Sequence, residues 1–386
     1  MKKQNKYITF SLPKIGKEEI DEVADSLRSG WITTGPKTAK FEEIIRNYTA
    51  SKYALSLNSC TAGLHTSLLS CGIKPGDEVI TSPLTFAATA NTIIHVGATP
   101  VFVDIKKETV NIDEDFIEKA ITKKTKAIIP VHMAGRPCEM DKIMKIAKKH
   151  KLYVIEDAAQ AIGASYKGKK IGSIGDMTCF SFYATKNITT SEGGIVTTNN
   201  PKWAEKIKIY RLHGMSKDAW KRYSGSGYQH YDIIYPGFKY NMTDIAASIG
   251  IHQMAKINKF EKIREKIWNI YNNAFKDLPL TLPSSWPDYI KHARHLYTLL
   301  IDKKKVDIDR DEFIQEMHAA GIGTSVHFIP LHLLSYYKNK FNYKKGDYPN
   351  AEFIGERTVS IPLSPALTES EVKRIVKTVR KIILKK

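Results

Sequence analysis

The chain has 386 residues and a mass of 43.6 kDa, which suggests two or three domains at about 150 residues each. Hydrophobic residues make up 42% of it and charged residues 26%, a balance that excludes a mostly disordered chain and a small disulfide scaffold. The formal net charge is +19. Its lysines are scattered, without interleaved aromatic residues or a nucleic-acid motif, so we expect a solvated basic surface and no nucleic-acid partner. A small anionic substrate is compatible with this charge.

Several absences in the sequence point to a cytoplasmic protein. No apolar run reaches the roughly 18 residues of a membrane helix, and the basic N-terminus lacks the apolar segment of a secretory signal. The cysteines are widely spaced and form no CxxC pair, which is typical of reduced thiols. We therefore predict a cytoplasmic location, no membrane partner and no metal site. The four cysteines are Cys60, Cys71, Cys138 and Cys179.

Residues 50–200 alternate short apolar runs with helical patterns, which predicts a mainly parallel sheet covered on both faces. Ligands bind at the carboxyl ends of the strands in such sheets. The predicted strands are 54–57, 78–81, 101–104, 127–131, 152–155, 177–182 and 194–198, and the predicted helices are 61–69, 86–95, 113–121 and 140–149.

The pattern changes after residue 200. A helix at 202–210 is followed by a long segment, 214–240, that is rich in Gly, Tyr and Trp and lacks periodicity, as functional loops often do. One long helical stretch is predicted at 243–275. Beyond it we expect a smaller α/β domain with strands near 296–301 and 323–326 and helices near 311–320 and 369–383.

Three motifs lie at predicted strand ends. NSCTAG at 58–63 joins a strand to a helix, where free N–H groups suit a phosphate, although a simple helix cap is the favoured explanation for this motif alone. The pair Glu156-Asp157 ends a buried strand, where an acid needs a partner such as a protonated ring nitrogen or an ordinary backbone or basic donor; Asp157 is the better candidate. Lys186 follows another buried strand and could form a Schiff base, or be an ordinary surface lysine.

Taken together, the three motifs match the needs of pyridoxal 5'-phosphate (PLP): a phosphate site, a partner for the pyridine nitrogen and a Schiff-base lysine. Each motif is weak alone. Their order along the chain, and the intervals between them, make the combination specific.

The whole chain resembles the DegT/DnrJ/EryC1/StrS family of PLP-dependent sugar aminotransferases. The matching stretches include GWITTGP at 30–36, NSCTAGLH at 58–65, PLTFAATAN at 83–91, VIEDAAQAIGA at 154–164, SFYATKNITTSEGGI at 181–195, RLHG at 211–214, GFKYNMTDIAASIG at 237–250 and IPL at 361–363. The resemblance implies the PLP-dependent transferase fold type I: a large, mixed, mostly parallel α/β sheet flanked by helices, plus a smaller C-terminal α/β domain. We place the large PLP-binding domain at 1–255 and the small domain at 256–386.

The resemblance also implies roles for individual residues. Lys186 matches the Schiff-base lysine that moves protons between cofactor and substrate, and Asp157 matches the partner of the pyridine nitrogen. The other implied cofactor contacts are Thr61, Ala62 and Ser181 at the phosphate, Phe86 stacked on the ring, Gln160 beside the ring 3-oxygen, and Asn241 reaching the cofactor phosphate of a neighbouring subunit. A homodimer with shared active sites follows, and pyridoxamine 5'-phosphate (PMP) occurs in the cycle.

Substrate contacts are harder to assign. The loop containing His327 and His332 resembles a family loop near the sugar nucleotide, and the 220–235 stretch, with Tyr223, Tyr228 and Tyr231, resembles a mobile loop that could stack on a base. Thr33 is a further candidate. Simple packing is an alternative for all of them.

The implied reaction moves an amino group from L-glutamate to a keto group of a nucleotide-linked sugar, with C4 favoured. The amino sugar would serve the synthesis of a surface polysaccharide, lipid or glycan. A 3-keto sugar or a cyclitol ketone is an alternative within the family, and a non-catalytic PLP-fold regulator is a more distant one. Lys186 argues against the dehydratase relatives, which carry histidine at that position.

Overall fold

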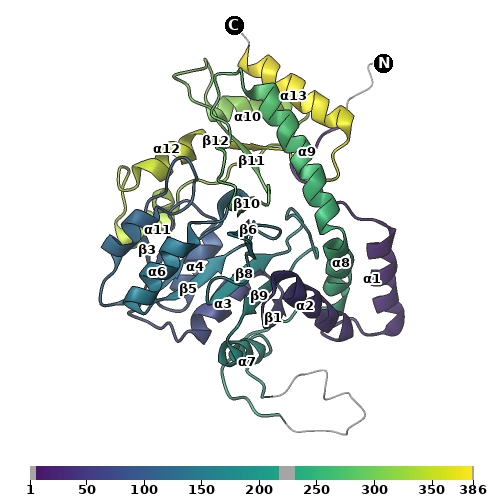
Figure 1. The fold of residues 1–386 in the computed structure, drawn as a ribbon, viewed down its shortest axis with the longest axis vertical. Coiled ribbons are helices and arrows are strands. Elements are labelled where there is room, and N and C mark those ends of the chain that lie inside the picture. The colour runs from purple at the N-terminus through teal and green to yellow at the C-terminus, as the bar shows by residue number, and fades with distance from the viewer. Residues whose placement is uncertain (1–5, 217–230, 385–386) are drawn as a thin grey trace.

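A computed structural model describes residues 6–216 and 231–384. Its centre is a seven-stranded sheet in the order β1-β9-β8-β5-β4-β2-β3 (Figure 1). The strands from β3 to β8 run parallel, whereas β9 is antiparallel to both β8 and β1. The sheet is therefore mixed and mostly parallel, as the sequence predicts. Its strands are β1 (Tyr53–Leu57), β2 (Glu78–Thr81), β3 (Thr99–Phe102), β4 (Thr125–Ile129), β5 (Tyr153–Asp157), β8 (Met177–Ser181) and β9 (Gly194–Thr198).

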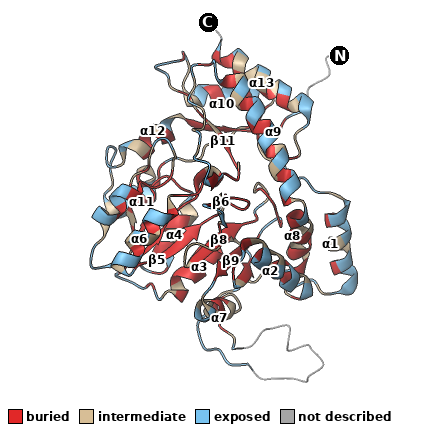
Figure 2. Ribbon diagram, in the orientation of Figure 1, coloured by how far each residue is buried: buried red, intermediate tan, exposed pale blue. Residues whose placement is uncertain are grey.

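Successive residues of the strands enter two separate hydrophobic cores, because side chains alternate between the faces of a sheet. On β5, for example, Val154 packs in one core and Ile155 in the other. Helices cover both faces, and Figure 2 shows the strands as the buried centre of the molecule. The first face packs against α2 (Pro36–Thr49), α6 (Met140–His150) and α8 (Asp244–Ala255), and the second against α3 (Cys60–Ser70), α4 (Ala87–His95) and α7 (Pro201–Tyr210).

A third core forms around the C-terminal elements, at the top of Figure 1. It joins residues of the long helix α9 to two paired strands and two further helices. These elements are α9 (Ile257–Phe275), β11 (Tyr297–Leu300), α10 (Arg310–Ala319), β12 (Thr358–Ile361) and α13 (Glu369–Ile383). Ile8, from the N-terminal segment, also packs there. The domain division at residues 255 and 256 stays a prediction.

Other elements lie around these cores. Helix α1 packs on α8, and a small sheet joins β10, β6 and β7. The bounds are α1 (Lys17–Ser29), α5 (Glu114–Ile117), β6 (Ser165–Tyr166), β7 (Lys169–Lys170), β10 (Ile290–Lys291), α11 (Ser335–Phe341) and α12 (Pro349–Arg357). Within the described residues, no helix is long and apolar enough to span a bilayer.

Three sequence predictions of elements were wrong in detail. The stretch 243–275 is two helices, which meet at Lys256. The helix expected at 113–121 is a single α-turn, α5, followed by a 3₁₀ turn. Residues 323–326 form no strand: the backbone of Gly323 bonds to Ile8 and that of Ser325 to Ser360, so no continuous ladder develops.

Candidate active site

A cavity of about 590 Å³ lies at the carboxyl ends of the central strands. Its wall contains seven of the residues predicted from the sequence, drawn from positions 61 to 327 of the chain. These are Thr61, Phe86, Asp157, Gln160, Ser181, Lys186 and His327. The sheet topology therefore gathers at one place the three motifs that the sequence shows separately.

One end of the cavity can bind a phosphate group. The first turn of α3 begins there, and Ser59 caps this helix by accepting from the backbone N–H of Ala62 at 3.1 Å. The cap and the phosphate interpretations are thus compatible, since the helix dipole and the remaining N–H groups still face the cavity with the Thr61 and Ser181 side chains. Gly194 is required here, because a Cβ would lie 2.4 Å from the Cys60 nitrogen.

Asp157 and Glu156 point to opposite faces of the sheet, and their partners distinguish them. Glu156 accepts from Gly175 N–H, from the Thr178 hydroxyl and from His132 Nε2, each within 2.8 Å. His132 Nδ1 accepts from the Cys138 N–H. The ring hydrogen is therefore on Nε2, which donates a hydrogen bond to Glu156. The Glu156 carboxylate is fully occupied by protein donors, which leaves Asp157 as the acid available to a ligand.

Asp157 is 5% exposed and lines the cavity. Its Oδ2 accepts from the Thr89 hydroxyl at 2.7 Å, and its Oδ1 accepts from the Ala159 N–H at 3.1 Å. Burial raises the pKa of this carboxyl, against the opposing effects of these two hydrogen bonds and of Lys186. A protonated ring nitrogen in the cavity would supply the charged partner that a buried carboxylate needs.

Lys186 lies on the loop between β8 and β9, which is closed by Phe182 N–H donating to Gly193 carbonyl at 2.9 Å. Burial lowers the pKa of the Lys186 amine, although Cys60 and Asp157 oppose the shift. A lowered pKa increases the neutral fraction of the amine, which is the form that reacts with an aldehyde.

Phe86 and Gln160 shape the space between these groups. Phe86 precedes α4, and its side chain is 64% exposed, so its ring face is free to stack on a planar ligand. Gln160 Oε1 accepts from Ala134 N–H at 2.6 Å, which leaves its amide NH₂ as the donor toward the cavity. The donor set, the exposed ring and the buried acid all fit PLP.

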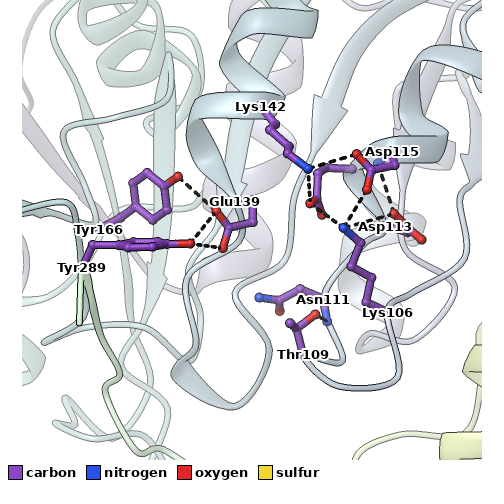
Figure 3. A network of polar contacts seen from close by, with 10 residues as sticks. Lys106, Thr109, Asn111, Asp113, Asp115, Glu139, Lys142, Tyr166 and Tyr289 are labelled. Atoms are coloured by element: carbon purple, nitrogen blue, oxygen red, sulfur yellow. Dashed lines mark hydrogen bonds and ion pairs between the residues drawn. The ribbon is translucent and has the colours of Figure 1, made fainter. Parts of the chain in front are cut away.

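A polar network that includes Asn111 and Glu139 (Figure 3) braces the segment after β4 that carries His132. Asn111 accepts from Met133 N–H and donates to the carbonyls of Arg136 and Pro137. Nearby, Glu139 accepts from the hydroxyls of Tyr166 and Tyr289 at 3.1 and 3.2 Å. These contacts fix the exit of β4 beside the cavity.

Several predicted residues lie away from the wall of this cavity. Ala62 is buried in α3 and does not line the cavity, although its neighbour Thr61 does. Asn241 donates from Nδ2 to Thr34 Oγ1 at 2.7 Å, and Thr33, exposed beside it, accepts from the Asp244 N–H. Tyr231 is 44% exposed, and Tyr223 and Tyr228 fall outside the described residues.

The two histidines of the 327–332 loop differ in position. His327 lines the cavity and pairs through Nδ1 with Ser360 Oγ at 2.9 Å; burial lowers its pKa to about 4, and Lys186 contributes. His332 is fully buried and pairs with Glu352 at 2.9 Å. The protein therefore encloses the His332 ring away from the cavity wall, and its contact with substrate stays a prediction.

Sequence reasoning missed other residues of the wall. His132 lies three residues beyond the end of β4 and lines the cavity, a signal similar to the one that identified Asp157 at the end of β5. His295 faces the cavity and donates from Nδ1 to Asn187 Oδ1 at 2.9 Å, a polarity fixed because Asn187 Nδ2 donates to the Ala293 carbonyl. Phe10 comes from the distant N-terminal segment, and no local pattern marks it.

Comparison with known proteins agrees with this geometry. The model of the DegT/DnrJ/EryC1/StrS aminotransferase family matches residues 13–380. An uncharacterized protein of Methanocaldococcus jannaschii is 61% identical, over 96% of each chain. The spore coat polysaccharide biosynthesis protein SpsC of Bacillus subtilis is 48% identical, over 99% of each chain.

Solved structures show the same fold with the cofactor. The PMP form of Spr1654, described as a putative sugar aminotransferase of Streptococcus pneumoniae, superposes with a TM-score of 0.91 at 38% identity, covering 97% of this chain and 98% of that one. A PLP form of the same protein is also known. The chain therefore belongs to the DegT/DnrJ/EryC1/StrS aminotransferase family, and it is a PLP-dependent sugar aminotransferase of fold type I.

Proposed function

We propose that the protein transfers the amino group of L-glutamate to the C4 keto group of a nucleotide-linked sugar. The observation that carries the proposal is the meeting of Lys186, Asp157 and the α3 N-terminus around one cavity. The choice of C4 is supported by SFYATKNITTSEGG and GFKYNMTDIAASIG, which resemble 4-keto-sugar members. The likeness to a spore coat polysaccharide biosynthesis protein supports an amino sugar for a surface polysaccharide. We propose that it is made in the cytoplasm.

Each proposed residue has a distinct task. PLP, when bound, holds the amino group between the two half-reactions. Thr61, Ser181 and the remaining N–H groups of the first turn of α3 bind its phosphate, and Ala62 lies in that turn with its own N–H donated to Ser59 Oγ. Asp157 keeps the ring nitrogen protonated, Phe86 stacks on the ring, and Gln160 donates to the ring 3-oxygen. The Lys186 amine is free once substrate has taken its place, and it then carries a proton between the substrate carbon and the cofactor carbon.

Labelled glutamate tests the reaction and its position. We expect ¹⁵N from glutamate to appear on C4 of a nucleotide-linked 4-keto sugar, with one 2-oxoglutarate released per amine formed. Nuclear magnetic resonance of the product reads the labelled carbon. Label at C3, or transfer only to a cyclitol ketone, would support the other branches of the family. If the PLP-loaded protein transfers no label to any 4-keto sugar, 3-keto sugar or cyclitol ketone, the proposal is contradicted.

A homodimer with shared sites is the second part of the proposal. Among the residues that the structure describes, Lys186 is the only lysine or arginine in the cavity wall, although glutamate and a sugar nucleotide are both anionic. Asn241 and Thr33 lie together outside this wall, with Thr33 exposed. We propose that Asn241 reaches the cofactor phosphate of the partner subunit, and that Thr33 and Tyr231 contact substrate there.

Mixed dimers of Lys186→Ala and Asn241→Asp chains test this arrangement. If Asn241 acts across the interface, each mixed dimer has one site with both lesions and one intact site. We expect up to about half of normal activity per mixed dimer, because separate sites contribute independently. Should Asn241 act within its own chain, every site keeps one lesion and mixing restores nothing. Each homodimeric variant is the control.

A further inference from the structure

The first turn of α4 contributes more than the ring contact of Phe86. Thr89 lies in that turn, is 0% exposed and donates its hydroxyl hydrogen to Asp157 Oδ2 at 2.7 Å. The hydroxyl of Thr85 lies 2.8 Å from that of Thr89. Both threonines are buried, and Thr85 lines the cavity.

The direction of these hydrogen bonds follows from the donor inventory. An ionised carboxylate only accepts, so Thr89, which has a single hydroxyl hydrogen, must give it to Asp157. The Thr89 oxygen is then left to accept from Thr85. The result is a directed chain, Thr85 to Thr89 to Asp157, that favours the charged form of the acid. The positive end of the α4 dipole acts in the same direction.

These hydrogen bonds also fix the orientation of the Asp157 carboxylate. Thr89 occupies Oδ2 and the Ala159 N–H occupies Oδ1, so the carboxylate is held from both sides. Its remaining lone pairs are the ones available to the cavity. Burial alone disfavours the charge, and these donors counter that effect.

We infer that Thr89, supported by Thr85, is a positioning residue that keeps Asp157 ionised and aimed at the ring nitrogen of PLP. The inference rests on the proposed role of Asp157. It assigns the N-terminus of α4 two tasks, stacking on the ring through the N-cap residue Phe86 and holding the acid through Thr89. The other ionisable groups that face Asp157 are Lys186, His132, Cys60 and Cys179.

Thr89→Val and Thr89→Ser separate the hydroxyl from the packing, since valine keeps the shape and serine keeps the donor. We expect Thr89→Val to weaken PLP binding by about tenfold in equilibrium dialysis, the equivalent of one charge-assisted hydrogen bond, and Thr89→Ser to stay within about twofold of wild type. Thr89→Ala provides a second variant without the donor if valine does not fold.

A spectroscopic readout distinguishes positioning from structure. The pH midpoint of the visible absorbance of bound PLP should rise in Thr89→Val, because a weaker negative charge beside the ring leaves less positive charge on the ring to repel the proton at the Lys186 nitrogen. The value of kcat should fall more than KM for glutamate changes. Serine should restore both. An unchanged midpoint and affinity in folded Thr89→Val would overturn the inference.

Combination with Asp157→Asn tests the route of the effect. If Thr89 acts through Asp157, adding Thr89→Val to Asp157→Asn has little further effect. We expect the PLP affinity to change by less than about twofold and the pH midpoint of the absorbance by less than about 0.3 units. A full additional effect would mean that Thr89 acts by packing, which contradicts the inference. Wild-type affinity and midpoint in Asp157→Asn alone would instead contradict the proposed role of Asp157 itself.

Discussion

Replacement of Lys186 by alanine is expected to abolish turnover, with a loss of at least about a thousandfold, because a covalent link and a proton carrier disappear together. The Lys186 side chain faces the cavity beside Asp157 and Cys60. The phosphate site around α3 and Ser181 does not include this amine, so the variant should still bind PLP. Single-turnover and steady-state assays with glutamate measure the loss.

The control for this variant is Lys169→Ala, which removes an exposed lysine of β7. It should retain wild-type activity. The characteristic visible absorbance of the lysine-linked cofactor should be absent only from Lys186→Ala. Near-normal transamination by Lys186→Ala would show that another amine serves as the catalytic lysine.

Asp157→Asn is expected to lower kcat by at least about a hundredfold while the protein remains folded. A neutral amide cannot hold the ring nitrogen protonated, so the ring withdraws fewer electrons from the reacting carbon. The asparagine amide has one oxygen, whereas the Asp157 carboxylate uses one oxygen for Thr89 and the other for the Ala159 N–H. One of these two hydrogen bonds is therefore lost, and a modest loss of stability accompanies the change.

Asp141→Asn is the matched control, since Asp141 is an exposed acid on α6 that pairs with Lys167. Thermal unfolding of both variants, followed by circular dichroism, separates chemistry from folding. Full activity of PLP-loaded Asp157→Asn would contradict the assignment. Global unfolding of Asp157→Asn would indicate that Asp157 is structural.

Local patterns were sufficient for the central sheet and for much of the site. The largely apolar runs of β4 and β5 are buried on both faces of the sheet and therefore read clearly as parallel strands. A reactive side chain that follows such a run, as Asp157 and Lys186 do, is carried to the carboxyl edge by the topology itself. The assignment of the individual cofactor contacts came from the family resemblance.

Features that depend on distant contacts were not predictable. The short strand expected at 323–326 fails because its backbone is shared between Ile8 and Ser360, more than 300 and about 35 residues away along the chain. Nothing local shows that His332 is enclosed with Glu352 whereas His327 faces the cavity. The hydrogen bond from Thr89 to Asp157 likewise joins residues 68 positions apart.

The most direct test of the central claim, that this cavity holds PLP on Lys186, is reduction of the PLP-loaded protein with borohydride followed by peptide mass spectrometry. Reduction makes the link between cofactor and lysine permanent, so the modified residue can be sequenced. The account predicts a pyridoxyl group on the peptide containing Lys186 and on no other in stoichiometric amount. Stoichiometric labelling of a different lysine, with Lys186 unmodified, would contradict it.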